Sequence, residues 1–522
     1  MKQMMIISER VWLIRILLLL LAIHFSWQVI PAKTRIMLIS DPHVMGPGLL
    51  INEGAAWEEA NYFDRKLNDY SRAIFDEVIA TALREQPDLF LISGDLTKDG
   101  EWLSHQYVVQ KLQELKTAGI KALVIPGNHD MGTSNALCFD GEEAYEADTI
   151  NTLQFAGLYK DFGYGEDMDR EPTTLTWCCE PVDGLVLIGI DTGHDKDPLN
   201  GVISKTTFDW VRERAENAKN AGKLVFVMMH HMLFPHVTNA EKFSSTYAVK
   251  LGVPIDGDGY AYYDYQSVRS RLSNAGVSVV LSGHVHASDV AKDSNNDMTR
   301  TIFDICTASC AAYPNPYRLL TLNDDGVTMR IQTRYISELP GVDDFAAIAE
   351  NRMMEGLERL VFSNTHNSDV SNLFAELFKI HVTGNEPENP RQPEFLAKYE
   401  EDLPQMKDDV QINDFLNAYS VTFDELTEFV HSLLEDRSNY GDPDRECRED
   451  DLNTTIPIRG DGWTAIESVK WKETLGRRTL ATGGTPESEK SRDGWYTLQG
   501  MCISKPSRKG VYIHKGKLSV VK

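Results

Sequence analysis

The sequence has few basic residues for its size. Its 522 residues include 52 Lys and Arg against 78 Asp and Glu, which gives a formal net charge of −26. A protein that coats nucleic acid usually carries a broad basic face, so we expect no stable nucleic-acid partner. A nucleotide or another phosphorylated small molecule is still compatible with this charge, because a local metal site can override the overall field.

Cysteine is also scarce. The seven cysteines lie at positions 138, 178, 179, 306, 310, 447 and 502, and no two of them form a Cys-x-x-Cys pair. An odd number without this spacing defines neither a disulfide framework nor a zinc motif. We interpret the cysteines as small buried hydrophobic residues. Export would permit a disulfide, so the pairing stays open.

One long apolar run lies near the beginning of the chain, at residues 16–23, and Lys2, Arg10 and Arg15 precede it. This pattern predicts a signal peptide over residues 1–32. The alternative is an uncleaved anchor, which would then be the membrane contact of the protein. Cysteine is missing near the end of the run, which argues against a lipoprotein. Both alternatives predict export, to the periplasm, the cell surface or the medium.

Residues 33–336 alternate short apolar runs with amphipathic stretches, which is typical of an α/β domain. The runs that we expect as strands are residues 35–40, 88–93, 120–125, 185–190, 223–229 and 277–282. The stretches that we expect as helices are residues 70–84, 101–118 and 207–221. A later pair of runs, residues 318–323 and 327–334, flanks Asp-Asp-Gly and predicts a β-hairpin.

The composition changes after residue 336. Residues 337–445 predict a helical extension, with helices over 343–362 and 395–434 and a proline-rich loop at 385–393 between them. Residues 446–522 are predicted as a polar linker followed by a β-rich tail. We expect short strands there at 496–503, 510–513 and 518–521.

The tail resembles the C-terminal sorting segments of exported Bacteroidetes proteins. The residues that carry this resemblance are Gly510-Val511-Tyr512-Ile513 and Gly516-Lys517…Val520-Val521-Lys522. The resemblance implies that export machinery is a partner of the tail. The alternative is an ordinary terminal hairpin.

Five short polar motifs each follow directly after an expected strand. They are Asp41-Pro42-His43, Gly94-Asp95, Gly127-Asn128-His129-Asp130, His230-His231 and Gly283-His284-Val285-His286. The carboxyl ends of strands in an α/β sheet border one crevice, so we expect the motifs to meet there. Residues two apart in an extended segment point the same way, so both members of Asp-x-His or His-x-His can reach one site. Carboxylate and imidazole ligands suit zinc, iron or manganese.

In this order the motifs resemble those of the calcineurin-like metallophosphoesterase superfamily, over residues 35–335. The resemblance implies a β-sandwich core flanked by helices. Further residues are similar to a bacterial envelope-associated branch: Gly94-Asp95-Leu96-Thr97, Ser104-His105 and Phe162-Gly163-Tyr164.

Carried over residue by residue, the resemblance implies two divalent metal ions, as manganese, zinc or iron. One ion would take Asp41, His43 and His286, the other would take Asn128, His230 and His284, and Asp95 would bridge them. A hydroxide held between the ions would attack phosphorus. His129 would give a proton or hydrogen bond to the leaving oxygen, and Asp130 would orient His129.

We therefore expect a binuclear metal-dependent hydrolase of phosphomonoesters or phosphodiesters, with a small-molecule substrate. One alternative is a metal-dependent nuclease, against which the acidic charge argues. The other is a non-catalytic surface binding protein on the same scaffold, against which the complete ligand set argues.

Two positions depart from related motifs. Lys98 stands where purple acid phosphatases have a tyrosine, so we expect no purple centre. The second acidic residue of a Gly-Asp-x-x-Asp motif is missing, and Asp99 lies one position later. Outside the motifs, we expect His236 in an exposed loop, Asp191 as support behind the site, and residues 44–61 as a loop at its rim.

Overall fold

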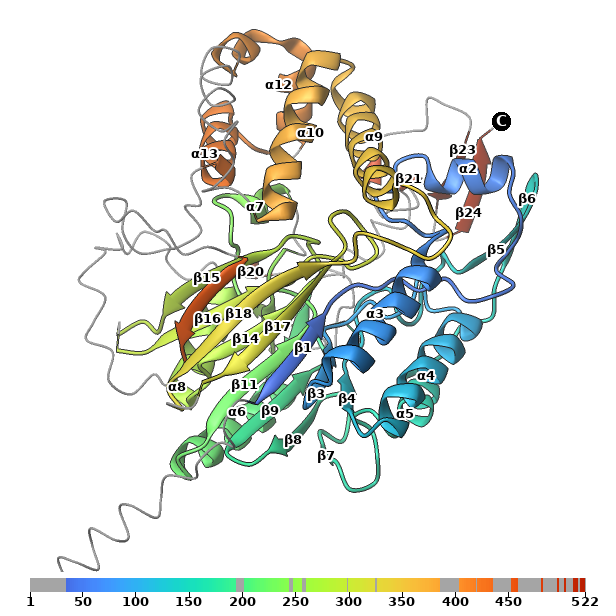
Figure 1. The fold of residues 1–522 in the computed structure, drawn as a ribbon. Coiled ribbons are helices and arrows are strands. Elements are labelled where there is room, and N and C mark those ends of the chain that lie inside the picture. Colours follow the sequence, from blue (N-terminus) through green and yellow to red (C-terminus); the bar gives the residue numbers. More distant parts are fainter. Residues whose placement is uncertain are drawn as a thin grey trace, which may run out of the picture.

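The computed structural model describes residues 34–193, 201–243, 247–255, 260–297, 299–323, 326–384, 403–418, 420–434 and 452–458, and short strands between residues 480 and 521. Figure 1 shows two large β-sheets in layers, with helices on their outer sides and a further group of helices beyond one end. Apolar side chains from both sheets form one continuous core. The predicted class, an α/β protein with a sandwich core flanked by helices, is confirmed.

The first sheet has the strand order β19-β18-β17-β1-β3-β4. Its parallel part consists of β1 (Arg35–Ile39), β3 (Leu89–Ile92) and β4 (Lys121–Val124). The expected hairpin is present as β17 (Pro316–Leu322) and β18 (Thr328–Tyr335). The strand β19 (Asn453–Pro457) pairs with β18, so the chain returns to this sheet after the helical extension. The sequence pattern did not indicate this return.

The second sheet has the order β15-β16-β14-β11-β9-β8-β7. Its centre is parallel and consists of β9 (Leu185–Ile190), β11 (Leu224–Met229), β14 (Val279–Ser282) and β16 (Thr301–Cys306). Its outer strands are antiparallel: β7 (Asp169–Arg170), β8 (Trp177–Val182) and β15 (Asp289–Ser294). All residues of β9 and β11 are buried, because both faces of a parallel sheet are covered.

Helices cover the outer sides of the two sheets (Figure 1). On the first sheet they are α3 (Ser71–Glu85), α4 (Trp102–Thr117) and α5 (Thr152–Leu158), and on the second α6 (Lys205–Asn220) and α8 (Tyr265–Ala275). A smaller sheet holds β10 (Val202–Ser204), β12 (Lys250–Pro254), β13 (Tyr260–Tyr263) and β20 (Leu480–Ala481). The expected helices and strands of the α/β domain are thus present.

The segment expected as a rim loop contains folded elements. These are β2 (Leu50–Asn52) and α2 (Ala55–Asn61), which pack with β5 (Leu137–Asp140) and β6 (Glu143–Glu146). The rings of Trp57 and Phe139 meet in the small core of this layer, with centroids 5.1 Å apart.

The helical extension comprises α9 (Phe345–Thr365), α10 (Ser368–Thr383), the 3₁₀ helix η1 (Leu403–Asp408), α12 (Val410–Ala418) and α13 (Phe423–Leu434). It has a core of its own, which also takes in Val237 and Ala240 from the loop and short helix α7 (Ala240–Phe243) after β11. The helix expected at 343–362 is confirmed as α9. The sequence did not predict α10. Residues 395–434 are expected to be mostly helical, and the described part from residue 403 onward consists mainly of η1, α12 and α13.

The tail forms a four-stranded sheet of β21 (Trp495–Tyr496), β22 (Cys502–Ile503), β23 (Gly510–His514) and β24 (Lys517–Val521). The strands expected at 510–513 and 518–521 are present. Of the strand expected at 496–503, the described residues belong to β21 and β22. The expected signal segment lies outside the described residues. In the described part of the chain, no helix has the length and apolar character to cross a membrane.

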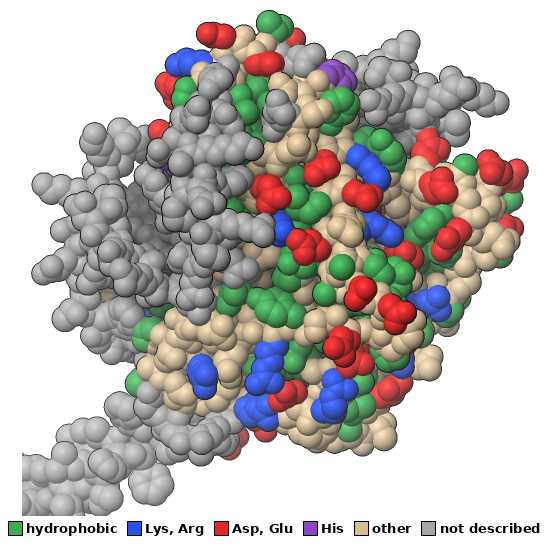
Figure 2. Space-filling model, turned by 45° about the horizontal axis from the view of Figure 1, so that its top comes forward, with side chains coloured by type: hydrophobic (Ala, Val, Ile, Leu, Met, Phe, Trp, Pro, Cys, Tyr) green, Lys and Arg blue, Asp and Glu red, His purple; other side chains and the backbone are tan. Residues whose placement is uncertain are grey.

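The described cysteines and the surface charges can be compared with what the sequence led us to expect. Cys138, Cys178, Cys179, Cys306 and Cys310 are all free thiols, and three of them are buried. Figure 2 shows acidic side chains spread over the face that it displays, interspersed with fewer basic ones.

Candidate metal centre

The five motifs lie at the carboxyl ends of the strands that precede them. The predicted ligands Asp41 and His43 follow β1, Asp95 follows β3, Asn128 follows β4, His230 follows β11, and His284 and His286 follow β14. Three of these strands belong to one sheet and two to the other. The structure therefore brings all seven predicted ligands together at one end of the sandwich.

Five of the predicted ligands have a backbone conformation that is uncommon outside glycine. Asp41, His43, Asp95, His284 and His286 have φ between 40° and 71°. Such strained residues persist where the surrounding structure fixes them, and they cluster at functional sites.

Two glycines allow the ends of the strands to approach closely. A Cβ atom on Gly127 would lie 2.2 Å from Asp95 Oδ1, and one on Gly283 would lie 1.9 Å from Ser40 Oγ. Any other residue would displace these neighbouring atoms, and glycine does not. These two motif positions are therefore required by packing.

Asp41, His43, Asp95 and His286 place one ligand atom each within 4.8 Å of one another. The Nε2 atom of His286 lies 3.2 Å from Asp41 Oδ1 and 3.2 Å from His43 Nε2. Asp95 Oδ2 lies 3.6 Å from His43 Nε2. Carboxylate and imidazole atoms at these separations can surround one cation after small adjustments.

The remaining predicted ligands are connected to Asp95 through His230. Asp95 Oδ2 lies 3.2 Å from His230 Nε2, which in turn lies 3.1 Å from Asn128 Oδ1. The rings of His230 and His284 have centroids 5.1 Å apart. His230 Nδ1 donates a hydrogen bond to the carbonyl of Ser93 at 2.9 Å, which leaves Nε2 as the ligand atom. Asp95 thus lies where a bridging ligand must be.

The protonation of these histidines suits metal binding. Burial lowers the pKa of His43 well below its ordinary value, lowers that of His284 to about 3, and lowers that of His286 as well. The three rings are therefore neutral at pH 7, which is the form that binds metals. Burial also opposes the charge on His230, but Asp95 and Asp41 outweigh it and raise its pKa to about 9. A cation at this position competes with that proton.

Neutral imidazoles, two buried carboxylates and an amide oxygen around a shared point form a donor set for divalent cations. Their mixture of nitrogen and oxygen atoms fits zinc, iron or manganese. The residues present therefore fit a metal centre, with Asp41, His43 and His286 on one side of Asp95 and Asn128, His230 and His284 completing the group.

His129 stands beside the ligands and lines the adjoining cavity. Its Nδ1 atom lies 2.8 Å from Asp99 Oδ1, and its backbone N–H donates to Asp95 Oδ1 at 2.8 Å. Its side chain is 27% exposed. Burial opposes protonation, but the carboxylates of Asp95 and Asp99 raise the pKa of His129. With Nδ1 held by Asp99, the ring has Nε2 left for a proton transfer in the cavity.

The predicted role of Asp130 is wrong. Its carboxylate accepts hydrogen bonds of 2.8 to 3.1 Å from the backbone N–H groups of Leu96, Thr97 and Gly127 and from the Thr97 hydroxyl. Asp130 therefore ties the loop after β3 to the loop after β4. The carboxylate that orients His129 is Asp99, the residue displaced by one position from the Gly-Asp-x-x-Asp pattern.

The expectation of an exposed loop histidine at position 236 is also wrong. His236 is buried, with Nε2 3.2 Å from Asp304 Oδ2 and Nδ1 3.5 Å from Asp289 Oδ1. Burial lowers its pKa, but the two carboxylates outweigh burial and raise it to about 10.

Asp191 accepts hydrogen bonds from the backbone of Leu175 and Gly193, and so holds the chain behind the Gly127 turn.

Comparison with known proteins identifies the domain that carries this geometry. Residues 34–288 match the family model described as calcineurin-like phosphoesterase, and this span contains all five motifs. This domain belongs to the calcineurin-like phosphoesterase superfamily. The superfamily assignment is thus confirmed, whereas the envelope-associated branch and the sorting tail stay predictions.

Individual relatives of the phosphoesterase domain are distant. A protein of Synechococcus sp. (strain WH7803), described as a probable cyclic nucleotide phosphodiesterase, is 25% identical over 252 residues, which cover 48% of this chain and 74% of the relative. A dimetal phosphatase from Danio rerio is 11% identical, with 59% of this chain and 96% of that chain covered and a TM-score of 0.38. A sulfate thiohydrolase from Thermus thermophilus is 12% identical, with 61% and 60% covered and a TM-score of 0.29.

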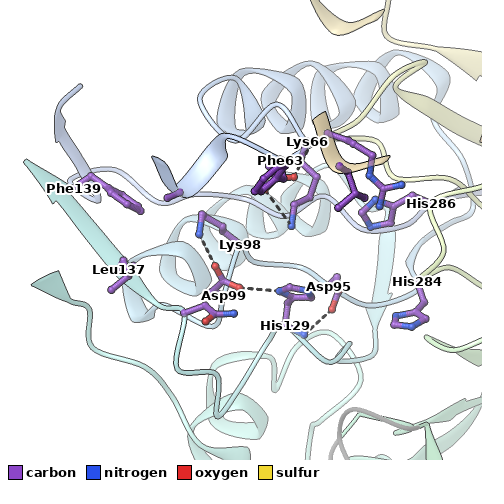
Figure 3. A pocket seen from close by; sticks show the side chains of 15 residues that line it. Phe63, Lys66, Asp95, Lys98, Asp99, His129, Leu137, Phe139, His284 and His286 are labelled. Carbon is purple, nitrogen blue, oxygen red and sulfur yellow. Dashed lines mark hydrogen bonds and ion pairs between the residues drawn. The ribbon is translucent and has the colours of Figure 1, made fainter. Parts of the chain in front are cut away.

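A cavity of about 310 Å³ opens beside the ligands of the phosphoesterase domain. Figure 3 shows Asp95, His284 and His286 toward one end of it and Leu137 and Phe139 toward the other. Its lining also includes the cations Arg65, Lys66 and Lys98, the ring of Phe63, and Leu360 from α9.

The lining of the cavity is what the sequence did not reveal. Asp99 was visible only as a displaced acidic residue, and the adjacent cations Arg65 and Lys66 carry no motif. Leu360 lies far along the chain, in a helix without any ligand-like residue. A single signal pointed toward this region, namely the expectation that residues 44–61 form a rim, and Ala60 does line the cavity.

Proposed function

We propose that this protein is a binuclear metal-dependent hydrolase of small phosphate esters that acts outside the cytoplasm. The observation that carries the proposal is the arrangement around Asp95. Asp95 lies among the seven candidate ligands, between His43 and His230, and the His129–Asp99 pair stands next to it at the edge of a cavity. Membership of the phosphoesterase superfamily supports hydrolysis of phosphoric esters as the reaction.

Charge favours an anionic substrate at this position. Two divalent cations would bring four positive charges, and the carboxylates of Asp41 and Asp95 offset two of them. The remaining positive charge attracts a phosphate group and holds it against the ligands. When bound, the cations supply the Lewis acidity that makes water nucleophilic near neutral pH and stabilises phosphoryl oxygens.

His129 and Asp99 complete the reaction. As the water oxygen bonds to phosphorus, the water loses a proton to the solvent, the bond to the leaving oxygen breaks, and that oxygen needs a proton. His129 Nε2 donates this proton, and its Nδ1 stays bonded to Asp99 throughout. His129 takes up a proton from the solvent again after each turnover. Asp99 orients the ring and stabilises its charged form, as a carboxylate does for a catalytic histidine.

A substrate panel tests this function. Enzyme stripped of metal is assayed with manganese, zinc or iron added back, against phosphomonoesters, phosphodiesters, cyclic nucleotides and a DNA oligonucleotide. We expect turnover of a small ester that depends on the added metal. Cyclic nucleotides belong in the panel because the Synechococcus relative is described as a probable cyclic nucleotide phosphodiesterase. Cleavage of the oligonucleotide alone would indicate a nuclease, and metal binding without any turnover would indicate a binding protein.

Action outside the cytoplasm is supported by the apolar run at residues 16–23 with its basic flank, and by the tail's likeness to sorting segments. Every candidate ligand lies between Asp41 and His286, far along the chain from the tail. Removal of residues 496–522 should therefore leave the rate and metal content of purified enzyme near normal. In the native host it should leave protein in the periplasm, as surface proteolysis and fractionation can measure. Delivery of the truncated chain to the surface would contradict the address role.

A further inference from the structure

Three cations line the cavity, and two of them form ion pairs with carboxylates of the lining. Lys98 Nζ forms a short ion pair with Asp99, and Lys66 Nζ lies 3.8 Å from Asp64 Oδ2. Asp95 is committed to the metal ligands. Arg65 is the remaining cation of the lining, and no described residue forms a salt bridge with it.

Arg65 is partly buried in this position. Burial lowers its pKa and Asp64 opposes the shift, but a guanidinium remains charged at any physiological pH. A partly desolvated cation without a salt bridge is costly unless a ligand supplies the counter-charge. Its planar fork matches the oxygen atoms of a phosphate or a carboxylate.

The helix α9 holds the chain of Arg65 against the cavity. Arg352 in α9 forms two contacts of 3.2 Å with the carboxylate of Asp69. At Gly356, an added Cβ would lie only 2.8 Å from the carbonyl oxygen of Asp64 and 3.2 Å from Arg65 Cγ. The helix and the loop are therefore in direct contact there.

The next turn of α9 extends the same contact. The guanidinium of Arg359 lies 4.9 Å from the ring centre of Tyr62 and donates to the Tyr62 carbonyl at 3.4 Å. Leu360 then enters the lining of the cavity. We call residues 62–69 together with α9 the α9 wall. The helical extension thus contributes to the site through this wall.

We propose that Arg65, held by α9, binds a second negative charge on the substrate, so that the enzyme selects phosphate esters with at least two negative charges. This inference rests on the proposed function. Two divalent cations would bring four positive charges, and Asp41, Asp95 and the attacking hydroxide would offset three of them. The ligand group then matches one negative charge of the phosphoryl group, and Arg65 matches the next. That charge is either the second one of a phosphomonoester or an oxyanion elsewhere on the substrate.

Three matched substrates separate these sources. Phenyl phosphate carries both charges on phosphorus, methyl phenyl phosphate carries one, and methyl 4-carboxyphenyl phosphate carries one on phosphorus and one on the remote carboxylate. The values of kcat/KM are measured for the wild-type holoenzyme and for Arg65→Gln at mildly alkaline pH. For each substrate, the kcat/KM of wild type is divided by that of Arg65→Gln. This ratio cancels the differences in intrinsic reactivity among the three substrates.

Arg65→Gln should lower kcat/KM about 10- to 100-fold for a substrate with two charges, the loss expected for one charged hydrogen-bonding partner. For methyl phenyl phosphate the loss should stay below about threefold. Loss confined to phenyl phosphate places the second charge on phosphorus, and loss confined to the carboxyphenyl ester places it on the remote group. Both outcomes support the proposal. Arg65→Lys should recover part of the loss, because it keeps the charge without the fork.

Arg212→Gln is the matched control, since Arg212 lies on α6 and its partners Asp209 and Glu216 are on the same helix. Calorimetry provides a readout without turnover. If the second charge lies on phosphorus, phenylphosphonate, a dianion, should bind Arg65→Gln more weakly than wild type, and its monomethyl ester should bind both alike. If the second charge lies on the remote group, the monomethyl ester of 4-carboxyphenylphosphonate should show this weakening instead. Equal loss for all three substrates, or no loss for any, would overturn the inference. If wild type hydrolyses none of them with any metal, the proposed function fails instead.

Discussion

The ligand group around Asp95 and the α9 wall border the same cavity but are built in different ways. The ligands come from strand ends, each set by a short motif and by the hydrogen bonds of a parallel sheet. The wall comes from a loop and a helix almost 300 residues apart in the chain, joined by contacts such as Arg352–Asp69. From this difference we propose that the strand ends determine the chemistry and the wall determines which ester is accepted.

The largest effect should come from the ligand that both cation positions share. Asp95→Asn removes the negative charge that His43 and His230 both border, and we expect it to lower metal content and turnover together. The expected loss of kcat exceeds about 10³-fold, because activation of the water and stabilisation of the phosphoryl oxygens both depend on the cations. Metal analysis and rates are measured on the same preparation. Full activity with normal metal would contradict the bridging role.

His129 should separate chemistry from metal binding. His129→Ala removes a ring that lies beside the ligands, so metal content should stay normal. Turnover should fall about 10²- to 10⁴-fold, the range for loss of a general acid. The fall should be largest for esters with poor leaving groups, which need the proton most. An equal fall for activated and unactivated esters would remove the proton-donor role, and loss of metal would make His129 a ligand.

Variants of Asp99 and Asp130 then test the finding that Asp99, and not Asp130, orients His129. Asp99→Asn weakens the contact that orients His129 and should lower kcat roughly 10- to 100-fold with KM little changed. Asp130→Asn instead places an amide against three backbone N–H groups. It should lower the free energy of unfolding by about 1–3 kcal/mol, and so lower Tm. Thermal unfolding and kinetics, measured on both variants, decide which of the two carboxylates orients His129. The reverse pattern, with Asp130→Asn altering kcat at unchanged Tm, would restore Asp130 as the partner of His129.

Much of the fold and nearly all of the ligand group could be predicted from the sequence, and the physical reasons are local. A buried parallel strand such as β11 is apolar throughout, and a polar residue directly after it stands out, as His230 does. Periodicity likewise revealed α3 and α9. These features depend on neighbouring residues in the chain, so a single sequence contains them.

The parts that escaped prediction depend on contacts across long distances in the chain. Asp99 and Asp130 are both acidic residues near a motif, and only their surroundings show which one reaches His129. His236 looks like an exposed loop residue until Asp289 and Asp304 are seen beside it. The pairing of β19 with β18 and the position of α9 over Arg65 are likewise decided by tertiary packing.

The smallest expected effect probes the wall without touching a residue of the cavity. Gly356 lies within α9, where alanine is ordinarily the better helix former by about 1 kcal/mol. In Gly356→Ala, however, the new Cβ must push away the backbone of Asp64, since it would approach that carbonyl oxygen to 2.8 Å. We expect the loop to shift and carry Arg65 with it. The preference for substrates with two negative charges should therefore fall about threefold, which is the cost of weakening one charged contact.

The matched control is Gly157→Ala in α5, because an added Cβ there meets nothing within 4 Å. That variant should keep the substrate preference and gain a little stability from helix propensity. In Gly356→Ala, metal content and the rate with methyl phenyl phosphate should also stay near wild type, since the strand ends do not move. An equal loss of rate on all substrates would show that α9 supports the ligand group itself. The distinction between chemistry set by the strand ends and selection set by the wall would then fail.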